Sequence, residues 1–464
     1  MISYTMARSV RARICRTAAT VSLSVAALSV TSCGPTEFLE VEDPDIIPPE
    51  ETRSAVGAHG VRTGALARLN TATSGVPSGG SESLFLLGGL FADEWINGDS
   101  FIARQEVDQR VVTPENNFLT TANRNLHRAR LSAEQALELL AEFDPNAPAW
   151  QVAEMYFVQA FVVNILAEHY CDGLVFSTLV NGIEQYGSPI ETTAAFELAL
   201  DHAENGLALN LGTTANDLRV RRALQVIRGR ILLNLDRPAD AATAVAGVPT
   251  SFRYTMRHSE TTNQNAFWLF NNNARRYSVG NNEGTNGLNF ATANDPRLPV
   301  CVGGDAACSA IGVTQTRRDD LGQPIHVQRI WPTRTDSVAI LMGVEARLIE
   351  AEAQLRAGDT TASLATLNAA RATVTGLTPL ADAGTTAARE NQLFRERAFW
   401  LFGRGTRVGD LRRLIRQYGR TPNTVFPTGT WHKGGNYGTD VNVPVPQAEE
   451  NNPNLEQSCL SRDA

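Results

Sequence analysis

Three acidic residues, Asp93, Glu94 and Asp99, lie close together in the sequence. Paired carboxylates are the catalytic groups of most glycoside hydrolases, where they face each other across about 5–9.5 Å. The sequence does not set such a separation, and the three residues lie at the end of a helix expected at residues 84–95. We therefore predict that they form a solvated helix end and not a catalytic pair.

A second charged group consists of Arg407, Asp410 and Arg413, whose spacing of three residues places them on one helical face. Such a group can bind an anion, or it can form a buried charge network that locks the last helix to the scaffold. We favour the network. The histidines are scattered without metal-ligand spacing, and no Ser or Cys nucleophile motif occurs. Nor do the glycines at residues 403–409 have the spacing of a dinucleotide fingerprint. The sequence thus predicts a protein that is not an enzyme, with no cofactor and no metal site.

Binding is the chemistry that the residue types do favour. Aromatic faces and side-chain amides together hold sugars and similar polyhydroxy ligands, because the rings cover apolar faces and the amides pair with hydroxyls. An Asn-rich region offers Trp268, Asn271 and Tyr277, and the loop after an early helix offers Trp95 and Asn97. These five residues are the candidate ligand-binding residues. For each aromatic, packing of a loop onto the scaffold is the alternative, and we favour it over a binding role.

The N-terminal sequence has the pattern of an exported lipoprotein. A basic region at residues 8–16 precedes an apolar run at residues 18–30, which is shorter than the ~20 residues of a transmembrane helix. Val-Thr-Ser at residues 30–32 then precedes Cys33, as in a bacterial lipobox. We predict a signal peptide at residues 1–32, lipidation of Cys33 and a leash at residues 33–50. Acyl chains on Cys33 would tether the chain to a membrane without inserting it.

The charge of the chain argues against some partners. The formal net charge is −8, and the basic leader contributes arginines without acids, so the remainder is more acidic still. An acidic body disfavours nucleic acid and an anionic membrane face as binding partners.

Four cysteines remain after Cys15, which lies in the leader, and Cys33. Export places them in an oxidising compartment, where an even number favours disulfides. Cys301 and Cys308 flank a flexible Gly-containing turn and are the predicted pair, because their spacing is poor for zinc. Cys171 and Cys459 are left over by elimination, and the sequence does not fix their pairing.

Helical periodicity dominates most of the chain. At residues 341–355 apolar side chains recur every three or four positions, Gly358 fits a left-handed helix end, and Asp359 or Thr360 can cap the helix that follows. The short connection makes this stretch an antiparallel helical hairpin of the tetratricopeptide type. Further helices are predicted at residues 56–69, 84–95, 118–143, 150–169, 194–209, 218–235, 239–245 and 389–417. We expect a mostly α-helical scaffold of irregular hairpins.

One region interrupts this pattern. Residues 249–335 are rich in Asn, Thr and Gly with isolated aromatics, and helical periodicity is lost there. We interpret them as a loop-rich ligand-binding insertion between a helical region at residues 51–248 and a C-terminal region at residues 336–464.

Several short motifs occur in one order along the chain. They are Phe-Leu-Glu-Val at residues 38–41, Tyr-Cys-Asp-Gly at 170–173, Asp-Pro-Arg-Leu at 295–298, Leu-Asn-Ala-Ala-Arg at 367–371, the Glu-Arg to Arg-Arg stretch at 396–413 and the Pro-Val-Pro to Asn-Leu stretch at 444–455. In this order they resemble the SusD/RagB-like nutrient-binding outer-membrane lipoproteins. The sequence departs from the family pattern at Cys171, Trp400, Arg404 and Thr406.

The resemblance implies a function and partners. It implies a lipid-anchored, cell-surface protein of the outer membrane that binds a nutrient, most readily a glycan, and passes it to a SusC-like TonB-dependent transporter. The alternative is a lipid-anchored helical scaffold for envelope assembly that has no small ligand.

Overall fold

The computed structural model describes residues 52–464 except residues 78, 79, 81, 181, 182, 315, 317 and 458. The signal peptide, Cys33 and the leash therefore lie outside the described residues. Thr52–Ala464 forms one compact unit, to which the helical region, the insertion and the C-terminal region all contribute.

The scaffold of this unit is a stack of α-helices. Its longer helices are α3 (Ala55–Thr73), α6 (Asn117–Phe143), α7 (Ala149–His169), α8 (Thr192–Ala208), α9 (Ala215–Asn234), α12 (Gly343–Arg356), α13 (Thr360–Arg371), α14 (Thr386–Trp400) and α15 (Arg407–Arg416). Its shorter helices are α4 (Leu84–Phe91), α5 (Ile102–Gln109), α10 (Pro238–Val245) and α11 (Ala306–Ser309). Neighbours pack in chain order from α3 through α6, α7, α8, α9 and α10 to α12 and α13. The chain is thus mostly α-helical with tetratricopeptide-like hairpins, as the periodicity predicts.

Local sequence signals set the helix boundaries of this stack. Thr214 and Asp217 form a reciprocal capping box at the start of α9. Asp359 caps α13 by accepting a hydrogen bond from the backbone N–H of Ala362, and Gly358 before it has a φ of 85°. The hairpin of α12 and α13 therefore has the turn that its sequence predicts.

Helix α7 is the centre of the core. It is the one helix among the described residues that is long and apolar enough to cross a membrane, yet 72% of its most apolar window is buried inside the unit. The ring centroid of Phe157 on α7 lies 4.6 Å from that of Tyr254. The ring centroid of Phe161, also on α7, lies 6.3 Å from that of Phe85. We therefore assign α7 to the core of the fold.

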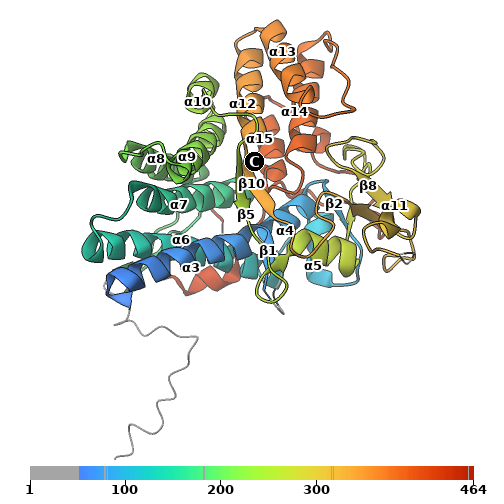
Figure 1. The fold of residues 1–464 in the computed structure, drawn as a ribbon. Helices are drawn as coiled ribbons and strands as arrows, with labels where there is room; N and C mark the ends of the chain where they lie inside the picture. The colour runs from blue at the N-terminus through green and yellow to red at the C-terminus, as the bar shows by residue number, and fades with distance from the viewer. Residues whose placement is uncertain are drawn as a thin grey trace, which may run out of the picture. The chain divides into compact units, whose positions relative to one another are not determined.

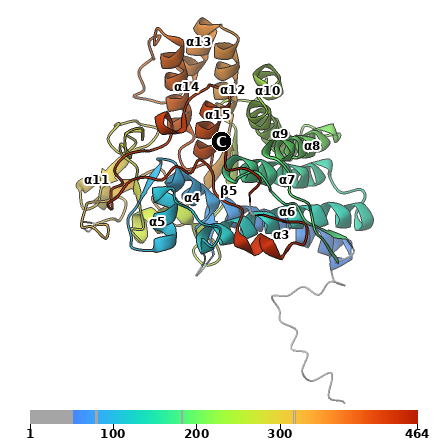
Figure 2. The ribbon, with the colours of Figure 1, turned by 180° about the vertical axis from the view of Figure 1, so that it is seen from behind.

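Short strands occur in the region that lacks helical periodicity and also in the connections of the helical regions. The described strands form five two-stranded antiparallel sheets, β1–β6, β2–β7, β3–β4, β5–β10 and β8–β9. Their bounds are β1 (Gly75–Val76), β2 (Trp95–Asn97), β3 (Thr178–Val180), β4 (Ile183–Gln185), β5 (Arg253–Met256), β6 (Gln264–Asn265), β7 (Tyr277–Val279), β8 (Val300–Val302), β9 (His326–Gln328) and β10 (Val338–Met342). A π-helical turn, η1 (Trp268–Asn273), lies between β6 and β7, and two 3-10 turns follow later, η2 (Pro422–Thr424) and η3 (Gln447–Asn451). Helices α8 and α9 lie at one end of the unit and α11 lies at the other, with α4 nearer the middle (Figures 1 and 2).

Two predicted helices are interrupted. The helix predicted at residues 84–95 ends with α4, and its last residue begins β2. The helix predicted at residues 389–417 is divided into α14 and α15, because Gly403 and Gly405 have φ angles of 67° and 66°. A Cβ atom at Gly405 would lie 2.5 Å from the ring of Phe85, so this close approach also requires glycine.

A buried charge network joins the last helix to the scaffold. Asp410 on α15 accepts hydrogen bonds from Nε and Nη2 of Arg397, both at 2.8 Å, and from Nη2 of Arg413 at 3.0 Å. Arg413 also pairs with Glu352 on α12. Burial alone would raise the pKa of Asp410, but the guanidiniums of Arg397 and Arg413 hold that pKa below its usual value. The predicted network is confirmed, although its third member, Arg407, pairs elsewhere.

Candidate ligand-binding site

Four of the five predicted ligand-binding residues meet at the sheet of β2 and β7. Asn97 lies opposite Tyr277, and Trp95 lies opposite Val279. The side-chain amide of Asn271 on η1 donates hydrogen bonds to the backbone oxygen of Tyr277 at 2.8 Å and to that of His326 at 2.9 Å. The fold therefore brings the early loop and the insertion together, as a shared site requires.

These four residues lie beneath the surface and not on it. Trp95, Asn97, Asn271 and Tyr277 are all 0% exposed. The ring of Trp95 lies 4.9 Å from that of Phe402, and it packs against two further rings, Phe267 and Tyr277, at 6.1 and 6.2 Å. For the aromatics, this is the packing of a loop onto the scaffold that the sequence favours over a binding role. The four side chains form a buried floor, because each ring packs in the core and each amide pairs with backbone or loop groups.

Trp268 is the one predicted residue with an accessible side chain. It is half-buried at the start of η1, and the guanidinium of Arg334 lies 5.0 Å from its ring centroid. Its backbone N–H donates to the side-chain oxygen of Asn265 at 3.0 Å, which fixes the start of the turn. Trp268 immediately precedes Leu269, which lines a pocket.

That pocket has a volume of about 380 Å³ and is lined by polar and apolar surface in similar amounts. It lies between the sheet of β1 and β6 and the turn η1. Its lining residues are Val76, Pro77, Gly80, Gln264, Leu269, Phe270, Ala274 and Arg276. Arg276 is the charged residue of this lining, and Gln264 contributes a side-chain amide. Small-ligand sites usually combine apolar surface with a few convergent polar groups.

Arg276 connects the pocket to an exposed aromatic ring. Its guanidinium lies 5.8 Å from the ring centroid of Phe270 and 5.5 Å from that of Phe101. It forms no ion pair with any carboxylate that the structure describes. Phe101 is 52% exposed and its neighbour Ile102 is 72% exposed. Arg276 thus lines the pocket and also lies against the exposed ring of Phe101, which is outside the lining.

Arg104 is a buried residue that contacts the segment carrying Phe101. Its Nε donates to Glu82 at 2.8 Å, and it also pairs with Asp99. Its guanidinium lies 5.5 Å from the rings of Phe101 and Tyr277. This buried cation therefore ties the loop that carries Phe101 to the floor of the site.

The sequence missed Phe101, Ile102 and Arg276. The one local signal is that Phe101 lies close after the turn-forming Asn-Gly-Asp at residues 97–99, which places it in a loop without showing that its ring is exposed. Nothing in the sequence places Arg276 between two rings, since Phe270 and Phe101 come from distant segments.

The acidic group at residues 93–99 is not a solvated helix end. Asp93 accepts from Nε and Nη2 of Arg407 at 2.6 and 2.8 Å. Glu94 accepts from the backbone N–H of Gly403 at 2.9 Å, and burial raises its pKa to about 8. Asp93 and Glu94 are buried, at 1% and 0% exposed. Asp93 accepts hydrogen bonds from Arg407 at the start of α15, and Glu94 accepts one from the backbone of the glycine turn before α15. Both carboxylates serve packing and line neither of the pockets described here.

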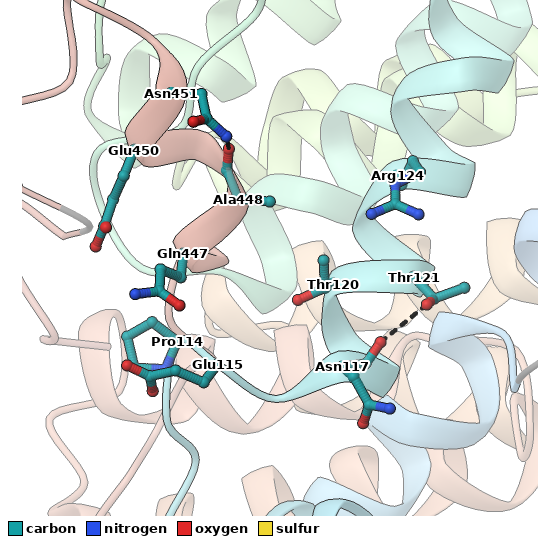
Figure 3. Close-up of a pocket in the computed structure, with 10 residues that line it drawn as sticks. All are labelled: Pro114, Glu115, Asn117, Thr120, Thr121, Arg124, Gln447, Ala448, Glu450 and Asn451. Carbon is teal, nitrogen blue, oxygen red and sulfur yellow. Dashed lines mark hydrogen bonds between the residues drawn. The ribbon is translucent and has the colours of Figure 1, made fainter.

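A second, larger pocket lies elsewhere in the unit. It has a volume of about 670 Å³ and separates the start of α6 from the tail segment around η3 (Figure 3). Its lining residues are Pro114, Glu115, Asn117, Thr120, Thr121, Arg124, Gln447, Ala448, Glu450 and Asn451. Among the residues described there, none is aromatic. This pocket offers hydrogen bonds but no stacking surface.

The four cysteines at residues 171, 301, 308 and 459 form two disulfides. Cys301 and Cys308 are joined across the turn between β8 and α11, with Cα atoms 5.5 Å apart. Cys171, after α7, is joined to Cys459 in the tail, with Cα atoms 5.8 Å apart. Neither disulfide lines the two pockets.

Comparison with known proteins finds similarity in structure and not in sequence. No family model matches the sequence, and no curated protein matches it. Among solved structures, a SusD superfamily protein from Parabacteroides distasonis superposes with a TM-score of 0.65 at 14% identity, covering 87% of this chain and 98% of that one. A SusD-like carbohydrate-binding protein from Bacteroides fragilis gives 0.64 at 14% identity over 87% and 99%. The chain has the SusD-like fold. A further SusD-like protein from Bacteroides fragilis, at 12% identity, gives a TM-score of 0.60 over 90% of this chain and 99% of that one.

The SusD-like fold agrees with the family that the motifs indicate. Two of those motifs are structural in this chain. Arg297 of Asp-Pro-Arg-Leu pairs with Glu396 at 2.6 Å, and Arg371 of the Leu-Asn motif pairs with Glu396 at 2.6 Å. These two motifs therefore mark residues that hold the fold together, and they say little about the ligand.

Proposed function

We propose that this protein binds an oligosaccharide at the pocket beside Phe101 and passes it to a TonB-dependent transporter of the outer membrane. The observation that carries the proposal is the arrangement of Phe101, Arg276 and Phe270 at the pocket of a SusD-like fold. It is supported by the solved neighbour described as a carbohydrate-binding protein. The role is binding and not catalysis.

The pocket suits the two kinds of surface that a sugar presents. The exposed ring of Phe101 can stack on the apolar face of a sugar ring, and the adjacent apolar surface of Ile102 extends that contact. Arg276 can donate hydrogen bonds to hydroxyl or carboxylate oxygens at the ring edge, because no described carboxylate occupies its guanidinium. The half-buried ring of Trp268 is a neighbouring stacking face for a longer chain.

The ligand is tested by profiling the purified protein against glycans and peptides. The proposal expects saturable binding of a glycan that is lost on Phe101→Ala and Arg276→Gln. Arg124→Gln is the matched control, since Arg124 lines the polar pocket instead. Binding that depends on Arg124 and not on Arg276 would move the site to the polar pocket. A protein that binds a membrane protein but no glycan or peptide would instead be the scaffold that the sequence left as the alternative.

Membrane attachment and the transporter are parts of the same proposal. Lipidation of Cys33 would hold the unit at the cell surface, where a SusC-like barrel can receive ligand from it. Labelling with radioactive palmitate in the native host should mark the chain and should fail for Cys33→Ser. Affinity purification from the outer membrane should recover a TonB-dependent barrel, and recovery of the chain without one would contradict the transfer step.

A further inference from the structure

A second cluster of polar side chains lies beside Asn97, the last residue of β2. Asp108 on α5, Glu283 after β7 and His432 in the tail each offer a ligand atom, and these atoms lie within 4.8 Å of one another. Asp108 and Glu283 are buried, at 2% and 6% exposed, and His432 is half-buried. Three segments that are distant in sequence therefore converge on one point with a nitrogen and two carboxylates.

The histidine ring is oriented as in a metal ligand. Nε2 of His432 lies 3.1 Å from the backbone oxygen of Asn97. A carbonyl oxygen only accepts, so Nε2 carries a proton, and in the neutral ring the lone pair is on Nδ1. Metal-binding histidines are commonly fixed in this way, by donating the other ring N–H to a carbonyl or carboxylate.

The free ring nitrogen points into the cluster. Nδ1 of His432 is buried and has no hydrogen-bond partner, and it lies 3.6 Å from Oδ2 of Asp108. That separation is too long for a hydrogen bond. Two groups with lone pairs thus face each other in a buried place, an arrangement that a cation between them would stabilise.

The carboxylates are also oriented by neighbouring donors. Oδ2 of Asp108 accepts from Nε1 of Trp431 at 3.0 Å and from the backbone N–H of Asn97 at 3.3 Å. The hydroxyl of Tyr437 donates to Oε2 of Glu283 at 2.7 Å. Such outer hydrogen bonds fix ligating carboxylates in known metal sites.

We propose that Asp108, Glu283 and His432 bind a divalent transition-metal ion of the Zn²⁺ class. One imidazole nitrogen with two carboxylate oxygens suits zinc better than calcium, which prefers oxygen ligands alone. The nearby ammonium of Lys433 is neutralised by Asp320, whose two oxygens lie 2.6 and 2.7 Å from it. The other cluster of suitable type, Cys301, Asp305 and Cys308, is excluded because its thiols form a disulfide.

The site would fix the segment that carries the ligand surface. Asp108 belongs to α5, which starts directly after Phe101, and the backbone of Asn97 contacts both Asp108 and His432. A bound ion would therefore hold α5 and the tail against β2. The metal site itself does not depend on the proposed glycan binding.

The test is zinc binding to the purified chain, prepared without a polyhistidine tag, stripped with a chelator and kept oxidised. Calorimetric titration should show one Zn²⁺ per chain, bound more tightly than Ca²⁺, with a rise in the midpoint of thermal unfolding. His432→Gln and Asp108→Asn should each weaken zinc binding by about tenfold or more. His326→Gln, on a half-buried histidine of β9 outside the cluster, should bind zinc as the native chain does.

A spectroscopic measurement covers the case in which a variant fails to fold. Co²⁺ added to the stripped native chain should give visible absorption bands typical of imidazole and carboxylate ligands, and Zn²⁺ should remove them. The proposal is overturned if the native chain shows no saturable zinc binding, if His432→Gln binds zinc unchanged, if His326→Gln loses binding equally, or if Ca²⁺ binds more tightly than Zn²⁺.

Discussion

Asn97 on β2 lies directly opposite Tyr277 on β7 in an antiparallel pair. Phe101 follows Asn97 after one short turn, and Arg276 immediately precedes Tyr277. The pair therefore sets the position of Phe101 relative to Arg276, although the two residues belong to distant segments. The positions of Phe101 and Arg276 in the proposed site therefore depend on the packing of the buried residues Asn97 and Tyr277.

The floor should be a determinant of stability. Trp95→Ala removes a 0%-exposed ring that packs against Phe267 and Phe402, so we expect the free energy of unfolding to fall by about 3–5 kcal/mol. Trp268→Ala, on a half-buried ring, should cost clearly less. Denaturant unfolding measures both variants. Equal losses would mean that Trp95 is not part of a packed floor.

Removal of one member of the buried charge network should lower the free energy of unfolding substantially. Asp410→Ala leaves Arg397 and Arg413 short of a buried partner, which typically costs about 3–5 kcal/mol of folding free energy. Asp240→Ala is the control, because its pair with Arg237 is half exposed and such pairs contribute about 0–1 kcal/mol. Thermal and denaturant unfolding should separate the two variants, and a small loss for Asp410→Ala would argue against the network.

Glu94 should make stability depend on pH. Burial raises the pKa of Glu94 from 4.5 to about 8, so the folded chain holds this proton more tightly than the unfolded chain. The stability that the protonated group contributes is complete below pH 4.5 and is lost as the pH rises through 8. Unfolding free energies measured across this range should fall for the native chain and fall less for Glu94→Gln. An identical slope in both would contradict the assignment.

The two disulfides should contribute unequally to stability. Loop-closure entropy predicts about 2–3 kcal/mol for Cys301–Cys308, whose cysteines are 7 residues apart, and about 5 kcal/mol for Cys171–Cys459, with a separation of 288. Paired Cys→Ser variants compared by denaturant unfolding test this order. A reversed order would show that strain in the folded state outweighs the entropy of the unfolded chain.

The helical scaffold was predictable because its signals are local. Amphipathic spacing, the Asp359 cap and the left-handed turn at Gly358 lie within a few residues of the structure that they specify. The division between α14 and α15 was missed although Gly403 and Gly405, whose positive φ angles cause it, are visible in the sequence. The contact that also requires glycine at residue 405, with Phe85, is between residues distant in sequence. A local pattern carries no information about such a contact.

The site was only partly predictable for the same reason. The sequence offered the two aromatic regions as separate sources of ligand contacts, and composition does not tell a packed ring from an exposed one. Trp95 and Tyr277 became the floor because three further rings, Phe267, Phe270 and Phe402, pack against them. Likewise, Asp93 and Glu94 looked solvated because their partners, Arg407 and Gly403, lie far along the chain.

The most direct test of the central claim is calorimetric titration of the best glycan from the binding profile into the native chain, Phe101→Ala, Arg276→Gln and the control Arg124→Gln. We predict that affinity falls by about tenfold or more for the first two variants, as expected when a central aromatic or arginine contact is removed. Arg124→Gln should bind as the native chain does. Unchanged affinity in Phe101→Ala and Arg276→Gln, with both variants folded, would contradict the account.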